Sequence, residues 1–153
     1  MDFGKLFLKL FGTNKYHFEE VHIDQEVIDS IIYYAKSSDP NEFIALFDAS
    51  INDKILHIDN LIFLPGETSG EGAIMNTGML PAMTNNWGSV HSHPGPTALP
   101  SGTDLATFAK MGLFHMIICQ PYDENCILAY NRYGEFAGFR IVWILLTIRK
   151  KKK

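Results

Sequence analysis

The sequence predicts a mixed α/β domain, because one segment with helical spacing is followed by several short apolar segments of strand length. Val27, Ile28, Ile31, Ile32 and Ala35 recur at intervals of one, three and four residues, which is typical of an amphipathic helix. Apolar runs of four to eight residues, bounded by turn-forming residues, are typical of buried strands. Alternation of the two kinds of segment along one chain indicates a sheet with helices packed against it.

The first half of the chain supplies one helix and two strands. Asp24 is a suitable N-cap for the first helix, and Asp39-Pro40 ends it, since proline restricts the residue before it. Residues 43–47 contain few polar side chains and are predicted to form a central strand. Asn52-Asp53 then forms a turn into residues 54–64, where alternation predicts a half-exposed strand.

The middle of the chain is a long segment rich in Gly, Thr, Asn and Pro, residues 65–86, which is either a functional loop or contains a short strand near 73–76. Residues 87–92 are predicted to form a strand. Ser101 then caps a helix that runs to about Met111 and is ended by Gly112. Three further strands, expected to be antiparallel through hairpins, are predicted at 114–119, 127–130 and 136–146.

Length and charge indicate one domain and exclude a broad nucleic-acid surface. The 153 residues are enough to bury a core, and we expect a single domain over 1–153. The net charge is −4, but Arg149–Lys153 is a basic tail of five positive charges, so the rest of the chain carries 8 basic and 17 acidic side chains, a net charge of −9. Phosphate binding needs a basic face, so no nucleic-acid partner is expected. The tail is interpreted as a solvated end.

The two ends and the cysteines favour a cytoplasmic protein. Residues 1–14 form an amphipathic segment without a signal-peptide cleavage site, expected to pack on the domain rather than contact a membrane. Residues 141–148 are too short an apolar run to span a bilayer and suit a buried strand. Cys119 and Cys126 flank a turn and are expected to be buried thiols, although they could face each other across a hairpin.

Metal-binding side chains are concentrated between positions 91 and 104. In a strand, side chains at i and i+2 share a face, so His91 and His93 project together. Asp104 lies in the first turn of the helix capped by Ser101, which brings its carboxylate towards the same point. Two imidazoles and one carboxylate are typical of a catalytic zinc site that keeps its fourth position for water.

Each of these features has a simpler explanation when taken alone. Most His-x-His pairs bind no metal, Ser101 is adequately explained as a helix N-cap, and Asp104 is a first-turn acid favoured by the helix dipole. The joint spacing favours a metal site, since seven residues separate His93 from Ser101 and two separate Ser101 from Asp104. The other histidines, which have no comparable partners, are His17, His22, His57 and His115.

A hydrolytic site also needs a general base, and Glu42 is the first candidate. Glu67 and Glu71 precede the His-x-His strand, and Glu19 and Glu20 precede the first helix, so all four remain rivals on position alone.

The segment His91-Ser92-His93-Pro94, with Ser101 and Asp104, resembles the signature of the JAMM metalloproteases, which are built on the MPN (Mov34) domain. The resemblance covers nearly the whole chain and is that of a compact prokaryotic or archaeal member. It implies the MPN fold, which is cytidine-deaminase-like, with a mixed curved β-sheet flanked by helices. In this family a glutamate lies on the strand just after the first helix, the place of Glu42. A glycine often follows that glutamate, whereas Ile44 and Ala45 stand here.

The resemblance implies a role for each residue. His91, His93 and Asp104 would bind Zn²⁺, Glu42 would hold the zinc water and shuttle its proton, and Ser101 would donate a hydrogen bond to the oxyanion. The reaction implied is isopeptidase cleavage, of the kind found in deubiquitinases, at the Gly-Gly end of a ubiquitin-like modifier or sulfur-carrier protein. The partner is thus such a modifier or its conjugate. The loop from Gly66 to Asn86 either clamps the modifier tail by strand addition or only covers the sheet.

Three other classes are kept as alternatives. A non-catalytic MPN scaffold usually lacks a metal ligand, and none is missing here. A DNA-repair-associated relative fits poorly with the acidic body. A zinc deaminase needs cysteine ligands after a Pro-Cys pair, which Cys119 and Cys126 do not supply. The oligomeric state is not predicted by any of these patterns.

Overall fold

The computed structural model describes residues 16–63, 66–69, 72–75 and 87–144. The amphipathic segment 1–14, the basic tail 149–153 and the end of the predicted strand 136–146 lie outside the described residues. The strands are β1 (Glu20–Asp24), β2 (Ile44–Asn52), β3 (Ile55–Ile62), β4 (Gly66–Ser69), β5 (Gly72–Met75), β6 (Gly88–His93), β7 (Phe114–Cys119), β8 (Ile127–Asn131) and β9 (Arg140–Val142). The helices are α2 (Gln25–Ser38), α3 (Gly102–Lys110) and the 3₁₀ turn η2 (Glu124–Cys126).

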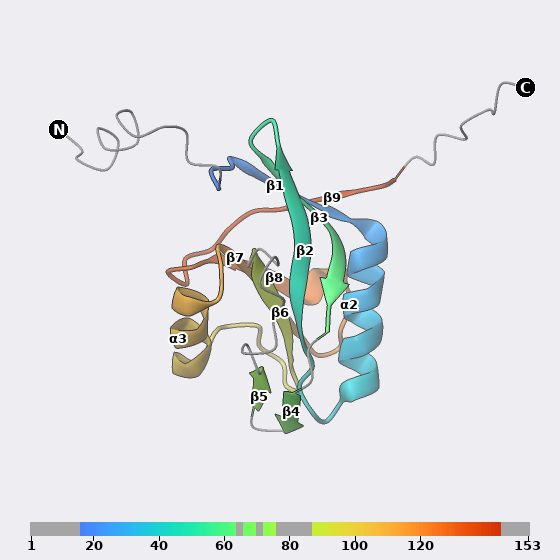
Figure 1. Ribbon diagram of the computed structural model, residues 1–153. Helices are drawn as coiled ribbons and strands as arrows, with labels where there is room; N and C mark the ends of the chain where they lie inside the picture. Colours follow the sequence, from blue (N-terminus) through green and yellow to red (C-terminus); the bar gives the residue numbers. More distant parts are fainter. Residues whose placement is uncertain (1–15, 64–65, 70–71, 76–86, 145–153) are drawn as a thin grey trace, which may run out of the picture.

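A seven-stranded mixed sheet forms the centre of the molecule, in the order β8-β7-β6-β2-β3-β1-β9. β2 is antiparallel to β3 and β6, whereas β6 pairs in parallel with β7. The helices α2 and α3 lie on opposite sides of this sheet (Figure 1). β4 and β5 form a separate antiparallel pair.

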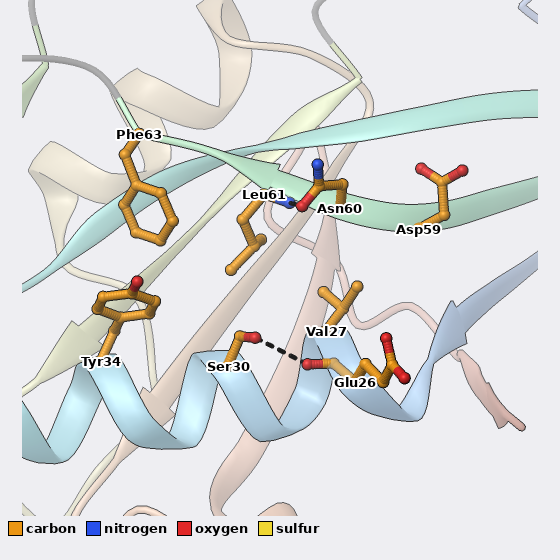
Figure 2. A pocket seen from close by; sticks show the side chains of 8 residues that line it. All are labelled: Glu26, Val27, Ser30, Tyr34, Asp59, Asn60, Leu61 and Phe63. Atoms are coloured by element: carbon orange, nitrogen blue, oxygen red, sulfur yellow. Dashed lines mark hydrogen bonds between the residues drawn. The ribbon is translucent and has the colours of Figure 1, made fainter. Parts of the chain in front are cut away.

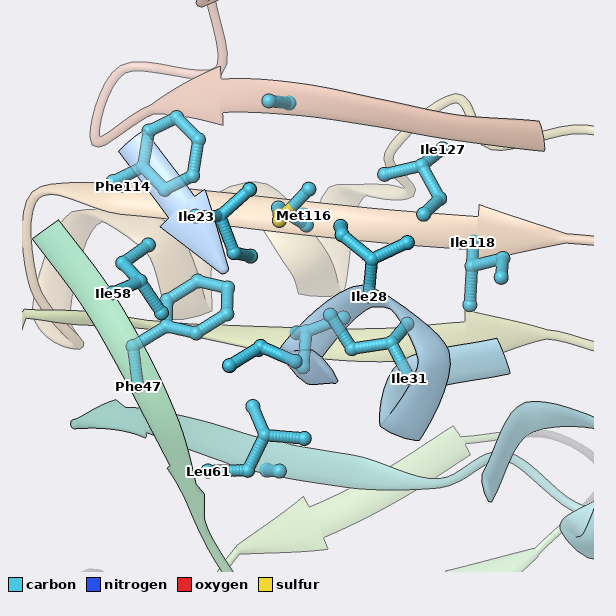
Figure 3. Packing of buried hydrophobic residues seen from close by; sticks show 14 of the residues in the cluster. Ile23, Ile28, Ile31, Phe47, Ile58, Leu61, Phe114, Met116, Ile118 and Ile127 are labelled. Atoms are coloured by element: carbon cyan, nitrogen blue, oxygen red, sulfur yellow. The ribbon is translucent and has the colours of Figure 1, made fainter. Parts of the chain in front are cut away.

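The main core lies between α2 and the sheet (Figure 3). Ile28 and Ile31 of α2 are fully buried, and they pack in one cluster with Phe47, Ile58 and Met116 from the strands. The predicted helical spacing therefore points its apolar face at the sheet. Burial of side chains of this size stabilises the fold by roughly 1.5–3 kcal/mol each.

A second, smaller core holds α3 against the other face of the sheet. Phe108 is the buried residue of α3, and its ring stacks on His115 at a centroid distance of 4.3 Å and on Tyr130 at 5.8 Å. Tyr130 also donates its hydroxyl to the carbonyl of Ala98, at 2.7 Å, in the loop that leads to α3. These contacts fix the start of α3 beside the end of β6.

Close approach of two backbones requires glycine where β6 and β7 begin. Gly88 has φ of +143°, and a Cβ there would lie 1.6 Å from the Phe114 carbonyl oxygen. Gly112, at φ of +119°, meets the Gly88 backbone in the same way, at 2.5 Å. The predicted end of the second helix at Gly112 is thus confirmed, and its glycine also allows β7 to pair with β6.

Most of the predicted elements are confirmed. The first helix begins after Asp24, as expected, but the Asp24 side chain makes no capping hydrogen bond and instead pairs with His57 Nε2 at 2.6 Å. The central position of the strand predicted at 43–47 is confirmed, since β2 is the fourth strand of seven. The turn is also confirmed, with Asp53 and Lys54 at positive φ.

Some predictions at the edges of the sheet are wrong. β1 was not expected, because a five-residue strand next to a helix gives little periodic signal. The predicted strand 136–146 is divided. Phe136 makes a single antiparallel bridge with Tyr130 at the end of β8, as a hairpin requires, whereas Arg140–Val142 pairs in parallel with β1 at the far edge. The described part of 141–148 is not buried either, since Trp143 and Ile144 are exposed. The segment 65–86 contains β4 as well as the short strand predicted near 73–76.

The two cysteines lie close together as free thiols. Cys119 is buried and Cys126 is partly exposed. Burial and a hydrogen bond with Cys126 raise the pKa of the Cys119 thiol. The expectation of buried thiols is therefore confirmed for Cys119, whereas Cys126 is only partly buried, and both thiols are free. In the part of the chain that the structure describes, every helix is too short or too polar to cross a membrane.

Candidate metal centre

Three metal-binding side chains meet at the end of β6 and the start of α3. His91 Nε2 and His93 Nε2 lie 3.0 Å apart, and they lie 3.1 Å and 3.3 Å from the two oxygens of Asp104. The predicted sharing of one strand face by His91 and His93 is therefore confirmed. All three side chains are largely buried, with 7%, 16% and 15% of their surfaces exposed.

The spacing of these atoms fits one zinc ion. Nitrogen and oxygen ligands lie about 2.0–2.2 Å from Zn²⁺ in a tetrahedral site, so two ligand atoms are about 3.3–3.5 Å apart. The three separations observed, 3.0–3.3 Å, are close to these values. The donor set of two histidines and one carboxylate is typical of catalytic zinc rather than of structural zinc.

The loop after β6 sets the tautomer of His93. Its Nδ1 lies 3.1 Å from the carbonyl oxygen of Thr97, so this nitrogen donates a proton and Nε2 keeps a lone pair for a metal. The carbonyl also fixes the orientation of the ring. Thr97 was not predicted as part of the site, because backbone groups leave no signal in side-chain identity.

A capping box orients Asp104. Ser101 Oγ accepts the Asp104 N–H at 3.2 Å, and Asp104 Oδ2 accepts the Ser101 N–H at 2.6 Å. Both the predicted N-cap and the first-turn position of the carboxylate are confirmed. Because the Ser101 oxygen acts as an acceptor here, its own hydroxyl proton stays available to another group.

Pairing of β2 with β6 places Glu42 next to the cluster. The Phe43 N–H donates to Ser92 Oγ at 2.9 Å, and the Ser92 N–H donates to the Phe43 carbonyl at 3.0 Å. Glu42 thus precedes a residue held against the serine between the two histidines. It lies two residues before β2 rather than on the strand, and its side chain is half-buried.

Electrostatic interactions within the cluster shift two pKa values. A hydrogen bond with Asp104 raises the pKa of His93, and the negative charge of Glu42 contributes to the rise. For Asp104, burial opposes the charged form, but hydrogen bonds with His91 and His93 outweigh it and hold its pKa well below the usual range. The carboxylate of Asp104 is therefore ionised and ready to bind a cation.

The other candidate residues have different partners. Glu19 pairs with Lys54, and Glu20 pairs with His22, on or beside β1, two strands from β2. Glu71 and the side chain of Glu67 lie outside what the structure describes. Among the described histidines, His57 pairs with Asp24, His17 with Glu19 and His115 with Ser89, which is consistent with the expected structural roles.

Besides Thr97, two structural residues of the site were missed by sequence reasoning. Ser92 joins β6 to the Glu42–Phe43 segment, and Tyr130 holds the loop between His93 and Ser101 through Ala98. The position of Ser92 between two histidines was a usable signal, since alternation points it to the opposite face of the strand. Tyr130 gave none, because its partner is a carbonyl 32 residues away.

The fold and the site together define a JAMM-type zinc protein of the MPN fold. The fold is a mixed sheet with one helix on each side, and the site has two histidines on an inner strand and an aspartate in the first turn of the next helix. The family of prokaryotic homologues of the JAB domain matches residues 24–132, and the chain belongs to this family. Its cofactor is Zn²⁺, which the His-His-Asp cluster fits.

Solved structures support the same assignment. A JAB1/MPN domain protein from Archaeoglobus fulgidus is 39% identical, with a TM-score of 0.62 over 79% of this chain and 98% of that one. A second solved structure, presented under the name JAMM as a metalloprotease-like zinc site in the proteasome and signalosome, is 36% identical to this chain. Its TM-score is 0.61, and the match covers 81% of this chain and 99% of that one. A protein of Haloferax volcanii called a probable metalloprotease is 27% identical over 124 residues, 76% of each chain.

Proposed function

We propose that this protein is a zinc-dependent peptidase that releases ubiquitin-like or sulfur-carrier proteins by hydrolysing the bond after their terminal Gly-Gly. The observation that carries the proposal is the cluster of His91, His93 and Asp104, with Glu42 near enough to influence His93. The family supports a metallopeptidase, and the relative from Haloferax volcanii is called a probable metalloprotease.

Each residue has a distinct part in this proposal. His91, His93 and Asp104 would hold Zn²⁺, which when bound polarises the scissile carbonyl and lowers the pKa of water. Glu42 would remove a proton from the attacking water and deliver it to the leaving amine. The Ser101 hydroxyl would donate to the oxygen that becomes negative during attack, since its oxygen is already held by the Asp104 N–H.

We infer the substrate class from the family resemblance, which implies a modifier that ends in Gly-Gly. Glycine residues let a chain run extended through a narrow site, because they carry no side chain to clash with the walls. The β4–β5 pair stands in the segment between β3 and β6 and offers backbone for strand addition by such a tail. In the proposed substrate, the terminal glycine of the modifier is joined to a lysine side chain by an isopeptide bond.

A scaffold role is less well supported. Non-catalytic members of such a family would have no reason to keep a full donor set in a tautomer suited to metal binding. Here all three donors converge, and Thr97 holds His93 with Nε2 directed at the other two. The order and ionisation of the cluster favour hydrolysis over tethering.

The test uses Glu42→Gln, which keeps the shape of the side chain but removes its basicity. Zinc-loaded parent protein and variant are incubated with a panel of Gly-Gly-ending modifiers joined to lysine side chains, and products are identified by mass. We expect the parent to release intact modifier and Glu42→Gln to be slower by roughly 10²–10⁴-fold at equal zinc content.

Three results would contradict this proposal. Loss of zinc from Glu42→Gln would make Glu42 a ligand, and undiminished cleavage would assign the base to another residue such as Glu67 or Glu71. If the zinc-loaded parent hydrolysed neither the conjugates nor unfolded peptides, the peptidase proposal would be wrong. The buried-histidine variant His115→Gln serves as a control for altered folding.

A further inference from the structure

A groove lies between α2 and the outer edge of β3, on the opposite side of the sheet from α3 (Figure 2). Its volume is about 220 Å³, and Val27 and Leu61 form a buried apolar floor. Small-molecule pockets usually measure about 300–1,000 Å³, so the groove is undersized for a cofactor or metabolite. It has room instead for a few side chains of an extended chain.

An unpaired strand edge borders this groove. The register of β1 with β3 ends at Ile23 and Ile58, where the chain turns into α2. Across the described ranges, no strand takes the place of β1 beside residues 59–63, although β2 still pairs on the other side. Edges of this kind are templates for a further strand.

One backbone donor on this edge is already bound by a neighbouring side chain. The Leu61 N–H donates to the neighbouring Asn60 Oδ1 at 2.9 Å. A local acceptor of this kind competes with backbone pairing and is easily displaced. A carbonyl oxygen of an incoming strand could take the place of Asn60 Oδ1. One hydrogen bond would then be exchanged for another.

The two ends of the groove differ in chemistry. Tyr34 and Phe63 face each other at one end, with a centroid distance of 4.5 Å, and both are partly exposed. Glu26 and Asp59 supply two exposed carboxylates at the other end. None of the eight residues that line the groove is positively charged.

From these observations we infer that the groove binds an extended, basic peptide strand from a partner protein. The strand pairs with the free edge of β3 at residues 59–63 and packs against α2, as in other cases of β-strand addition beside a helix. Its apolar side chains lie on Val27 and Leu61 and between the aromatic rings, while lysine or arginine side chains lie near Glu26 and Asp59. This site is separate from the zinc cluster and does not depend on peptidase activity.

The test measures binding of a fluorescein-labelled nine-residue peptide in which valine alternates with lysine. Two matched peptides are compared, one with glutamate in place of lysine, and one with alternate backbone nitrogens methylated so that they cannot donate. We expect only the first peptide to bind the full chain, with amide chemical-shift changes at residues 59–63 and 26–34. Equal binding of the methylated peptide would overturn strand addition, and shifts elsewhere would overturn the site.

Substitutions in the groove should change peptide affinity in ways that test the strand pairing and the charge preference separately. Asn60→Ala frees the Leu61 N–H and should raise affinity about 2- to 10-fold, from the net worth of a hydrogen bond. Glu26→Lys with Asp59→Lys should reverse the preference, so that the glutamate peptide binds better, whereas Glu135→Lys at an exposed site elsewhere should change nothing. An unchanged preference in the double variant would refute the charge argument.

Hydrogen exchange in the same samples distinguishes the partner peptide from two other occupants of the edge, which are another part of this chain and a second copy of it. If the Leu61 amide, whose donor lies on the unpaired side of β3, were strongly protected from hydrogen exchange in the dilute free chain, the chain itself would already fill the groove. If protection rose with protein concentration, a second copy would be the occupant. Either result would overturn the partner peptide, and the expected result is rapid exchange that slows on addition of the valine–lysine peptide.

Discussion

Ser101 has two jobs that substitution can separate. Its oxygen accepts the Asp104 N–H at 3.2 Å, and its hydroxyl proton stays free for an oxyanion. An N-cap is worth about 0.5–2 kcal/mol, and the long contact suggests the lower half of that range. For a chain of this length, 1 kcal/mol shifts the melting temperature by about 2–4 °C. Loss of an oxyanion donor instead reduces turnover by about 10²–10³-fold.

Three variants divide these effects. Ser101→Thr keeps both acceptor and donor, so we expect near-parental melting and activity. Ser101→Asp keeps an acceptor for the cap but has no donor, so it should melt near the parent yet lose about 10²–10³-fold in turnover. Ser101→Ala loses both, with a melting temperature a few degrees lower and the same loss of turnover.

The assay pairs thermal unfolding with cleavage of the Gly-Gly conjugate that the parent hydrolyses, and zinc is measured in each preparation. Zinc content matters because Ser101→Asp adds a charge beside Asp104. Turnover of Ser101→Ala close to that of the parent, at equal zinc, would refute the oxyanion role and leave Ser101 as a helix cap only.

Two further predictions concern the metal and a buried histidine. We expect about one zinc per purified chain by elemental analysis, and loss of it in His91→Ala/His93→Ala, since two of three ligands are removed; equal zinc in both would refute the site. Burial lowers the pKa of His115 to about 4. A histidine that is buried in its neutral form has a lower pKa in the folded protein than in the unfolded chain, where the pKa is about 6.5. Its contribution to folding stability is therefore complete above about pH 6.5 and is lost as the pH falls towards 4. In chelator-treated protein, the free energy of unfolding should therefore fall by about 2 kcal/mol more in the parent than in His115→Gln between pH 7.5 and pH 5. Parallel pH profiles of the two proteins would contradict this.

The zinc ligands could be predicted because their geometry is local. Alternation along one strand places His91 with His93, and a helix cap places Asp104 within one turn of Ser101. The first helix was predictable for the same reason, since its apolar residues repeat with a regular period. In each case, neighbours in the sequence determine the orientation of the side chain.

The edges of the sheet could not be predicted in this way. β1 has five residues and β9 has three, which is too short for a periodic pattern to stand out. Their parallel pairing joins residues more than a hundred positions apart. Such a pairing depends on the shape of the finished sheet, and an apolar run such as 141–148 indicates only that the segment favours a strand, not which partner it has.

The position of Glu42 lies between these two cases. Its charge is visible in the sequence, but four other glutamates are equally visible, and family order rather than spacing favoured it. What places it beside His93 is the pair of hydrogen bonds between Phe43 and Ser92, 49 residues apart. Phe43 also lies beside Tyr34, at 6.3 Å, at the aromatic end of the groove. The segment that carries Glu42, the proposed general base, therefore has two supports: hydrogen bonds to β6, the strand that bears the histidines, and packing against α2, the helix that borders the peptide groove.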